Sequence, residues 1–263
     1  MKKIILVFLI INFSNLLSQN GIVNYGYIES LTIGNSIGDD YNSVLKFNDN
    51  QAEYVTGKIN LETIERINKE TVYENPDGSG GFISSGLVVT QNGNQVITNL
   101  TDNYMLSNIK YGKQYFLKED IPQMKWKIYK DDSKKIGNYN CLKATTTFRG
   151  RDYTAWFTTE IPVLFGPWKF NGLPGLILEV YDTNKNVHWY FKNLEYPSND
   201  SEISNNIFDE DLKVQKNFLN IEEFTKKLQE LIETTNEKNL IFSKQNNIVI
   251  EPVKYESVFI EKF

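Results

Sequence analysis

Two arginines flank a glycine at residues 149–151, and they are the residues of this chain best suited to hold an anion. Only three arginines occur in the sequence, although Lys and Arg together number 28. The planar guanidinium fork grips a carboxylate or phosphate and stacks on aromatic rings, which an ammonium group does less well. The flanking stretches 139–148 and 152–157 alternate as strands do, so Arg149 and Arg151 are expected at a hairpin turn. We predict that one of them orients the anionic end of a ligand.

Aromatic residues supply the apolar half of this predicted site. All four tryptophans fall between positions 126 and 189. Such a concentration indicates an aromatic-lined pocket or a core packed with large rings. The predicted binding residues are Arg149, Arg151, Trp156, Trp168 and Phe170, and the ligand is expected to be apolar or peptidic. The alternative is structural: the rings pack in the core, and the arginines pair with Asp152 or Glu160.

The sequence offers little to other chemistries. It has one histidine, His188, and one cysteine, Cys141, 47 positions apart, which argues against a zinc site and a nucleophile–histidine pair. We therefore predict no catalytic residue, no metal and no cofactor, and leave open whether the protein is an enzyme. An envelope hydrolase that uses carboxylates, with Asp152 or Glu160 as candidates, is the alternative.

The stretch GPWKFNGLPGLILEV at 166–180 contains three glycines and two prolines. A phosphate-binding loop would lead into a helix, but LILEV reads as a buried strand, which favours a rigid corner instead. Pro174 and Gly175 suit the centre of a type II turn, which would give Gly175 a positive φ. The residues assigned to this structural motif are Gly166, Pro167, Gly172, Leu173, Pro174, Gly175, Leu176 and Ile177.

Period-two alternation dominates the rest of the chain and predicts a mainly β (α+β) fold, a curved antiparallel meander or half-barrel. Residues 43–47 and 52–55 form one expected hairpin. Residues 87–90 and 95–98, around Asn92-Gly93, form another. Apolar residues at helical spacing over 221–232 predict one amphipathic helix that packs on the sheet.

The first residues, MKKIILVFLIINFSNLLS, have two lysines followed by an apolar run and a small residue. This pattern predicts a cleaved signal peptide over 1–18, with export to the periplasm or beyond and no membrane anchor afterwards. Residues 19–263 are expected to form a single domain, with a mobile insertion at about 58–82 that holds a short helix near 61–67. The net charge of −5 argues against nucleic acid as a partner.

The hexapeptide GLPGLI at 172–177, together with GPWKF, FRGR, YTAWFT and EIP, resembles the GLPGLI family of secreted Bacteroidota proteins. The motif-bearing block spans about residues 136–195. The resemblance implies an exported envelope protein of unknown biochemical activity, sometimes encoded beside outer-membrane transport genes, so an outer-membrane transport protein is a possible partner. The order of the elements is also weakly similar to lipoprotein-carrier folds.

Overall fold

The computed structural model describes residues 20–30, 39–63, 71–74, 80–83, 89–111, 113–198, 211–250, 252–254 and 261. The predicted signal peptide and part of the predicted insertion lie outside the described residues.

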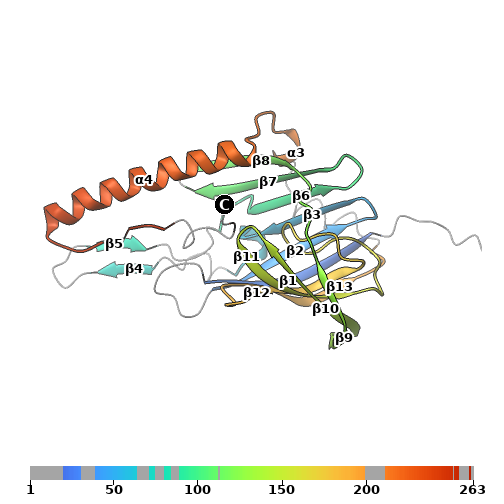
Figure 1. The fold of residues 1–263 in the computed structure, drawn as a ribbon. Coiled ribbons are helices and arrows are strands. Elements are labelled where there is room, and N and C mark those ends of the chain that lie inside the picture. Colours follow the sequence, from blue (N-terminus) through green and yellow to red (C-terminus); the bar gives the residue numbers. More distant parts are fainter. Residues whose placement is uncertain are drawn as a thin grey trace, which may run out of the picture.

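Eleven strands form one antiparallel sheet in the order β8-β7-β6-β3-β2-β1-β13-β12-β11-β10-β9 (Figure 1). Most neighbours in the sheet are also neighbours in the sequence, so the predicted mainly β meander is confirmed. The strands are β1 (Gly21–Glu29), β2 (Asp39–Phe47), β3 (Gln51–Thr56), β6 (Asn94–Asn99), β7 (Tyr104–Tyr111), β8 (Lys113–Asp120), β9 (Lys127–Ile136), β10 (Tyr139–Phe148), β11 (Arg151–Thr158), β12 (Leu176–Asp182) and β13 (Val187–Glu195).

The predicted hairpin around Asn92-Gly93 is wrong. β6 pairs with β3 and β7, whereas Thr90 forms an isolated bridge with Lys58. Gly93 still turns the chain with a φ of 65°, and its N–H donates to the Thr90 hydroxyl. Gly93 therefore bends the chain before β6, but the two neighbours of β6 are β3 and β7.

The region of the predicted insertion contains regular structure. A 3₁₀ turn, η1 (Ile59–Leu61), precedes a two-stranded sheet of β4 (Thr71–Glu74) and β5 (Gly80–Ile83). Most of the short helix predicted near 61–67 lies outside the described residues.

The predicted helix is confirmed and is longer than expected. α4 (Ile221–Asn246) follows the short α3 (Asp211–Val214), and a reciprocal capping box between Asn220 and Glu223 fixes its start. Phe224 and Leu228 of α4 pack on Tyr115 and Leu117 of β8, and the helix then extends past the end of the sheet (Figure 1). Among the described helices, none has the length and apolarity that a membrane span requires.

The main core lies on the inner face of the curved sheet. It joins distant strands, for example through the Trp189 indole N–H of β13, which donates to the Tyr54 hydroxyl of β3 at 2.8 Å. The connection between β11 and β12, residues 159–175, contributes five buried side chains to the same cluster: Ile161, Val163, Phe165, Phe170 and Leu173. The motif-bearing connection thus fills the inner face of the sheet.

Candidate functional site

The motif connection folds back on itself before it enters β12. The Gly172 N–H donates to Leu164 O at 2.9 Å, and the Ile177 N–H donates to Phe165 O at 3.0 Å. Gly172 has a φ of 88°, a conformation that favours glycine. Tyr25 of β1 then ties the start of β12 to the sheet, because its hydroxyl donates to Ile177 O at 2.7 Å. The predicted rigid corner is present.

The turn at Pro174-Gly175 differs from the predicted type II turn. The Gly175 N–H donates to Leu173 O at 2.8 Å, so the turn spans three residues, and Gly175 is not among the glycines with positive φ. Glycine is required there for space, because a Cβ would lie 2.1 Å from the carbonyl oxygen of Thr158. Gly166 has a similar constraint, since its Cβ would meet the Ile177 side chain at 2.8 Å.

Trp168 and Phe170 lie at a turn of the motif connection. Trp168 has a φ of 55°, and the Phe170 N–H donates to Pro167 O at 3.2 Å. The two rings meet, with centroids 5.4 Å apart, and Trp168 stacks on Trp189 at 5.8 Å. Phe170 is fully buried, whereas Trp168 is half-buried. Phe170 is thus a core residue, and Trp168 lies at the margin of the core.

Trp156 lies on the other face of the sheet. Tyr153 and Ala155 point into the core, so alternation along β11 turns Trp156 outward. The Lys134 ammonium lies 4.4 Å from the centre of its ring. The sheet therefore separates Trp156 from Trp168, and the predicted residues do not form one site.

Arg149 and Gly150 form the tight turn between β10 and β11, both with positive φ, and this confirms the predicted hairpin. Arg151 and Asp182 are both buried and form an ion pair at 3.1 Å. Asp182 also accepts the Val187 N–H at 3.2 Å, which holds the carboxylate in place. Arg151 is therefore part of the packed interior.

The predicted carboxylate partners of the two arginines have other roles. Asp152 accepts the Thr147 hydroxyl at 2.5 Å, and Glu160 accepts the Asn140 N–H at 2.8 Å. Both carboxylates are on exposed residues.

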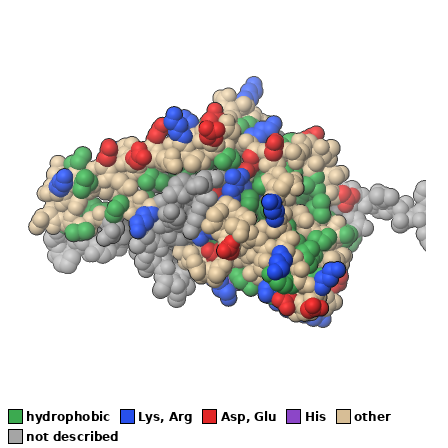
Figure 2. All heavy atoms as spheres, in the orientation of Figure 1, with side chains coloured by type: hydrophobic (Ala, Val, Ile, Leu, Met, Phe, Trp, Pro, Cys, Tyr) green, Lys and Arg blue, Asp and Glu red, His purple; other side chains and the backbone are tan. Residues whose placement is uncertain are grey.

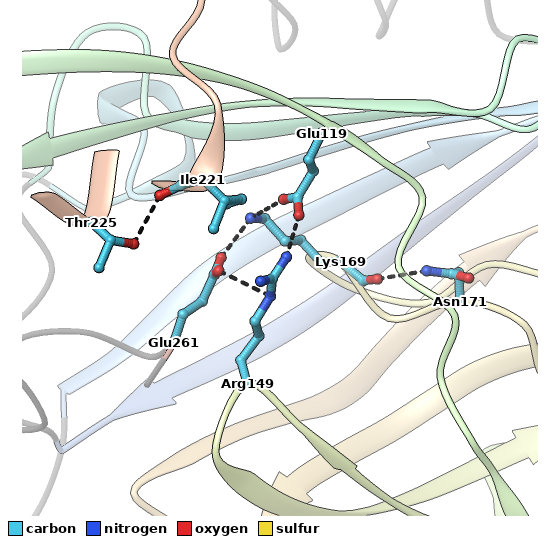
Figure 3. Close-up of polar contacts among 7 residues, drawn as sticks. All are labelled: Glu119, Arg149, Lys169, Asn171, Ile221, Thr225 and Glu261. Carbon is cyan, nitrogen blue, oxygen red and sulfur yellow. Dashed lines mark hydrogen bonds and ion pairs between the residues drawn. The ribbon is translucent and has the colours of Figure 1, made fainter. Parts of the chain in front are cut away.

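Arg149 belongs to a four-residue network (Figure 3). Its guanidinium pairs with Glu119 of β8 and, at 3.5 Å, with Glu261. Lys169 of the motif connection contacts the same two carboxylates at 2.5 Å each. The four side chains alternate in charge, and only 3% of the Lys169 side chain is exposed. We name these four residues the ionic cluster.

Lys169 remains charged in this environment. Burial alone would lower the pKa of the Lys169 ammonium, but the neighbouring carboxylates Glu261 and Glu119 raise it above its ordinary value. The cation depends on these anions, because an unpaired charge at such a position is strongly unfavourable.

Aromatic rings border the two cations of the ionic cluster. The Arg149 guanidinium lies 5.4 Å from the centre of the Phe148 ring, and the Lys169 ammonium lies 5.8 Å from that of Trp168. The Phe148 and Trp168 rings pack edge to face, with their centroids 5.8 Å apart. The arrangement can hold a carboxylate beside an apolar group.

The sequence analysis missed three members of the ionic cluster. The sequence does contain a sign that Lys169 is special, because it is the only charged residue between Pro162 and Leu178. Glu119 and Glu261 had none, because they lie 50 residues before and 92 residues after Lys169 in the sequence.

A second acidic position lies near the buried Arg151–Asp182 pair. Burial raises the pKa of Glu29 to about 7, although a hydrogen bond from the Tyr27 hydroxyl at 3.0 Å and the charge of Arg151 act in the opposite direction. His188 lies on the outward face, where its Nε2 is 3.0 Å from Glu179. Within the described part of the chain, no group of three or more His, Cys, Asp or Glu residues could hold a metal ion.

A family model matches the region of the hairpin turn and the motif connection. The model of one protein family, described as "Protein of unknown function (Porph_ging)", matches residues 149–179, from Arg149 through the motif to Glu179. No curated protein matches the chain. Two solved structures titled "Structure of PNGF-II", in space groups P21 and C2, are similar at 13% identity with TM-scores of 0.46 and 0.47. Each match covers 77% of this chain but only 31% of the PNGF-II chain.

Proposed function

We propose that this chain is an exported, non-enzymatic binding protein of the GLPGLI family, and that it holds a ligand with an anionic group and an apolar part. The observation that carries the proposal is the convergence of Arg149 and Lys169, from the hairpin turn and the motif connection, beside Phe148 and Trp168. Two cations next to aromatic rings suit a carboxylate on an apolar or peptidic molecule.

This proposal moves the predicted site rather than restating it. Arg149 and Trp168 remain in it, and Lys169 joins them. Arg151 and Phe170 are interior residues that support the site, and Trp156 lies on the opposite face of the sheet. The ligand would bind at the margin of the core, because the motif connection already fills the inner face.

Native mass spectrometry of the protein purified from the periplasm of its own organism tests the proposal. We expect a bound small molecule or peptide with at least one carboxylate. Arg149→Lys keeps the charge but removes the fork, and it should lower the recovered ligand several-fold without unfolding the protein. Lys143→Met removes a cation that pairs with Asp132 at a partly exposed strand position, and it should leave recovery unchanged. Equal recovery from Arg149→Lys and the parent would refute the site.

The second candidate, an interaction module for an outer-membrane transport protein, rests on a different surface. The far end of α4 exposes Leu240, Ile241 and Phe242, each by more than half, and Val249 nearby is 90% exposed. Figure 2 shows several hydrophobic side chains at the protruding end of the molecule, where α4 ends. Exposed apolar patches of this kind often mark interaction sites.

A photo-crosslinking amino acid at position 242 tests this second candidate in cells. We expect an adduct with an outer-membrane transport protein, and no such adduct from the same group at Glu230, an exposed position nearer the start of α4. The remaining alternative from the sequence is an envelope hydrolase that uses carboxylates. It requires a hydrolytic activity of the purified protein that Asp152→Asn or Glu160→Gln abolishes.

A further inference from the structure

The ionic cluster unites residues that differ in how the fold holds them. Glu119 is paired within the ladder of β7 and β8. Arg149 lies in the hairpin turn, and Lys169 lies in the motif connection, which is hydrogen-bonded to itself and to β12. Glu261 is different, because it lies outside the helices and strands that the structure describes.

Without Glu261, the other three members would carry one net positive charge. Lys169 and Glu119 expose 3% and 7% of their side chains, so little water can compensate that charge. Buried cations without a matching anion are strongly disfavoured. The fold thus builds a buried position that favours a second carboxylate beside Glu119, and in this structure Glu261 supplies it.

We propose that the site binds acidic peptides, and that Glu261 occupies it as an intramolecular mimic of that ligand. This inference rests on the proposed function and names its ligand class. The peptide places a glutamate carboxylate between Arg149 and Lys169, as Glu261 does at 3.5 and 2.5 Å. An apolar neighbour in the peptide contacts Trp168 or Phe148.

The chain's own sequence around Glu261 agrees with this ligand class. Residues 255–263 read YESVFIEKF, so the glutamate is preceded by an apolar residue and lies within two positions of an aromatic residue on each side. An external peptide must displace Glu261, so the C-terminal end lowers the apparent affinity by competition.

Fluorescence anisotropy with a labelled peptide of sequence YESVFIEKF tests the inference on the full-length mature protein. We expect Glu261→Gln to bind this probe at least tenfold more tightly than the parent. In a second probe, the glutamate equivalent to Glu261 is replaced by glutamine. The Glu261→Gln protein should bind this second probe at least tenfold more weakly than it binds the first. Glu230→Gln, an exposed substitution of the same kind on α4, should behave as the parent does.

Equal binding of the two probes, or no gain from Glu261→Gln, would overturn the inference. If Glu261→Gln does not fold, the two probes are compared on the parent protein at higher probe concentration. The parent should bind the probes weakly, and it should still prefer the probe that carries the glutamate. The two proposals fail differently. A carboxylate ligand recovered from the periplasm without probe binding refutes only the peptide class. If no ligand is recovered and neither the parent nor Glu261→Gln binds the probe, both proposals fail.

Discussion

Lys169 of the motif connection and Glu119 of the edge strand β8 form a buried ion pair at 2.5 Å, although 50 residues separate them in the sequence. Glu119 also pairs with Arg149, at the turn between β10 and β11. The ionic cluster thus joins one edge strand to a hairpin near the other edge. It links the two ends of the open sheet through the motif.

Lys169→Met should therefore destabilise the protein strongly. The substitution leaves two carboxylates with one cation, and breaking a buried pair in this way costs about 3–5 kcal/mol. Lys143→Met, which removes the partly exposed pair with Asp132, should cost less than about 1 kcal/mol. Chemical denaturation at pH 7 measures both values, and similar values for the two variants would contradict the role of Lys169.

The pH dependence of the same pair gives an independent check. Because the folded-state pKa of Lys169 is raised, its stabilisation is complete below the ordinary lysine pKa of about 10.4 and is lost as the pH rises through the folded value. The difference in stability between the parent and Lys169→Met should therefore shrink only above about pH 10.5.

Glu29 should make the protein less stable as the pH rises from about 4.5 to about 7. Its folded-state pKa of about 7 exceeds the unfolded value of 4.5, so the folded state binds more protons in this window. The loss is at most about 3.4 kcal/mol, at about 1.4 kcal/mol per pKa unit. Glu29→Gln should remove this slope and be the more stable protein at pH 8. Melting temperatures of both proteins from pH 4.5 to 8 measure the effect, and parallel curves would exclude it.

A tryptophan-to-phenylalanine substitution on each face of the sheet compares how much the two faces contribute to stability. Trp189→Phe removes a buried indole and its 2.8 Å hydrogen bond to Tyr54, which should cost about 2–3 kcal/mol. Trp156→Phe, on the outward face, should cost less than about 1 kcal/mol. Denaturation curves of the two variants decide the point, and the reverse order would place Trp156 in the core.

Gly175→Ala should destabilise the protein because the new Cβ would lie 2.1 Å from a backbone oxygen of Thr158. Relieving this overlap requires a shift of the backbone, at a cost of about 1–3 kcal/mol. Gly172→Ala meets no such contact, since its nearest neighbour is Trp126 at 3.9 Å, but its φ of 88° should cost about 1–2 kcal/mol. Thermal unfolding measures both, and a Gly175→Ala protein that melts as the parent does would remove the steric argument.

Export stays a prediction of the sequence. The mature protein should begin within a few residues of Gln19, because a small residue follows the apolar run at that point. N-terminal sequencing of the periplasmic protein checks this, and a chain that still begins at Met1 would contradict it.

The sequence alone was enough to predict the strands and the helix whose patterns involve only residues close together in the chain. Alternation predicted the hairpin of β2 and β3 and the hairpin that carries Arg149, and helical spacing predicted the start of α4. These features depend on neighbours a few residues apart, as does the corner at Gly172. The positive φ expected for Gly175 was wrong, because the structure needs glycine there for space.

Tertiary structure alone decided which residues meet. Strand pairing is non-local, so the sequence could not show that β6 pairs with β3 and not with residues 87–90. Likewise, a single strand has two faces, and only the packing of the motif connection on one face of the sheet decided that Trp156 of β11 would lie on the opposite face from Trp168. The ionic cluster is the clearest case. Glu119, Lys169 and Glu261 span 143 positions of the chain, and no local pattern records a contact that forms only when the sheet has curved around its core.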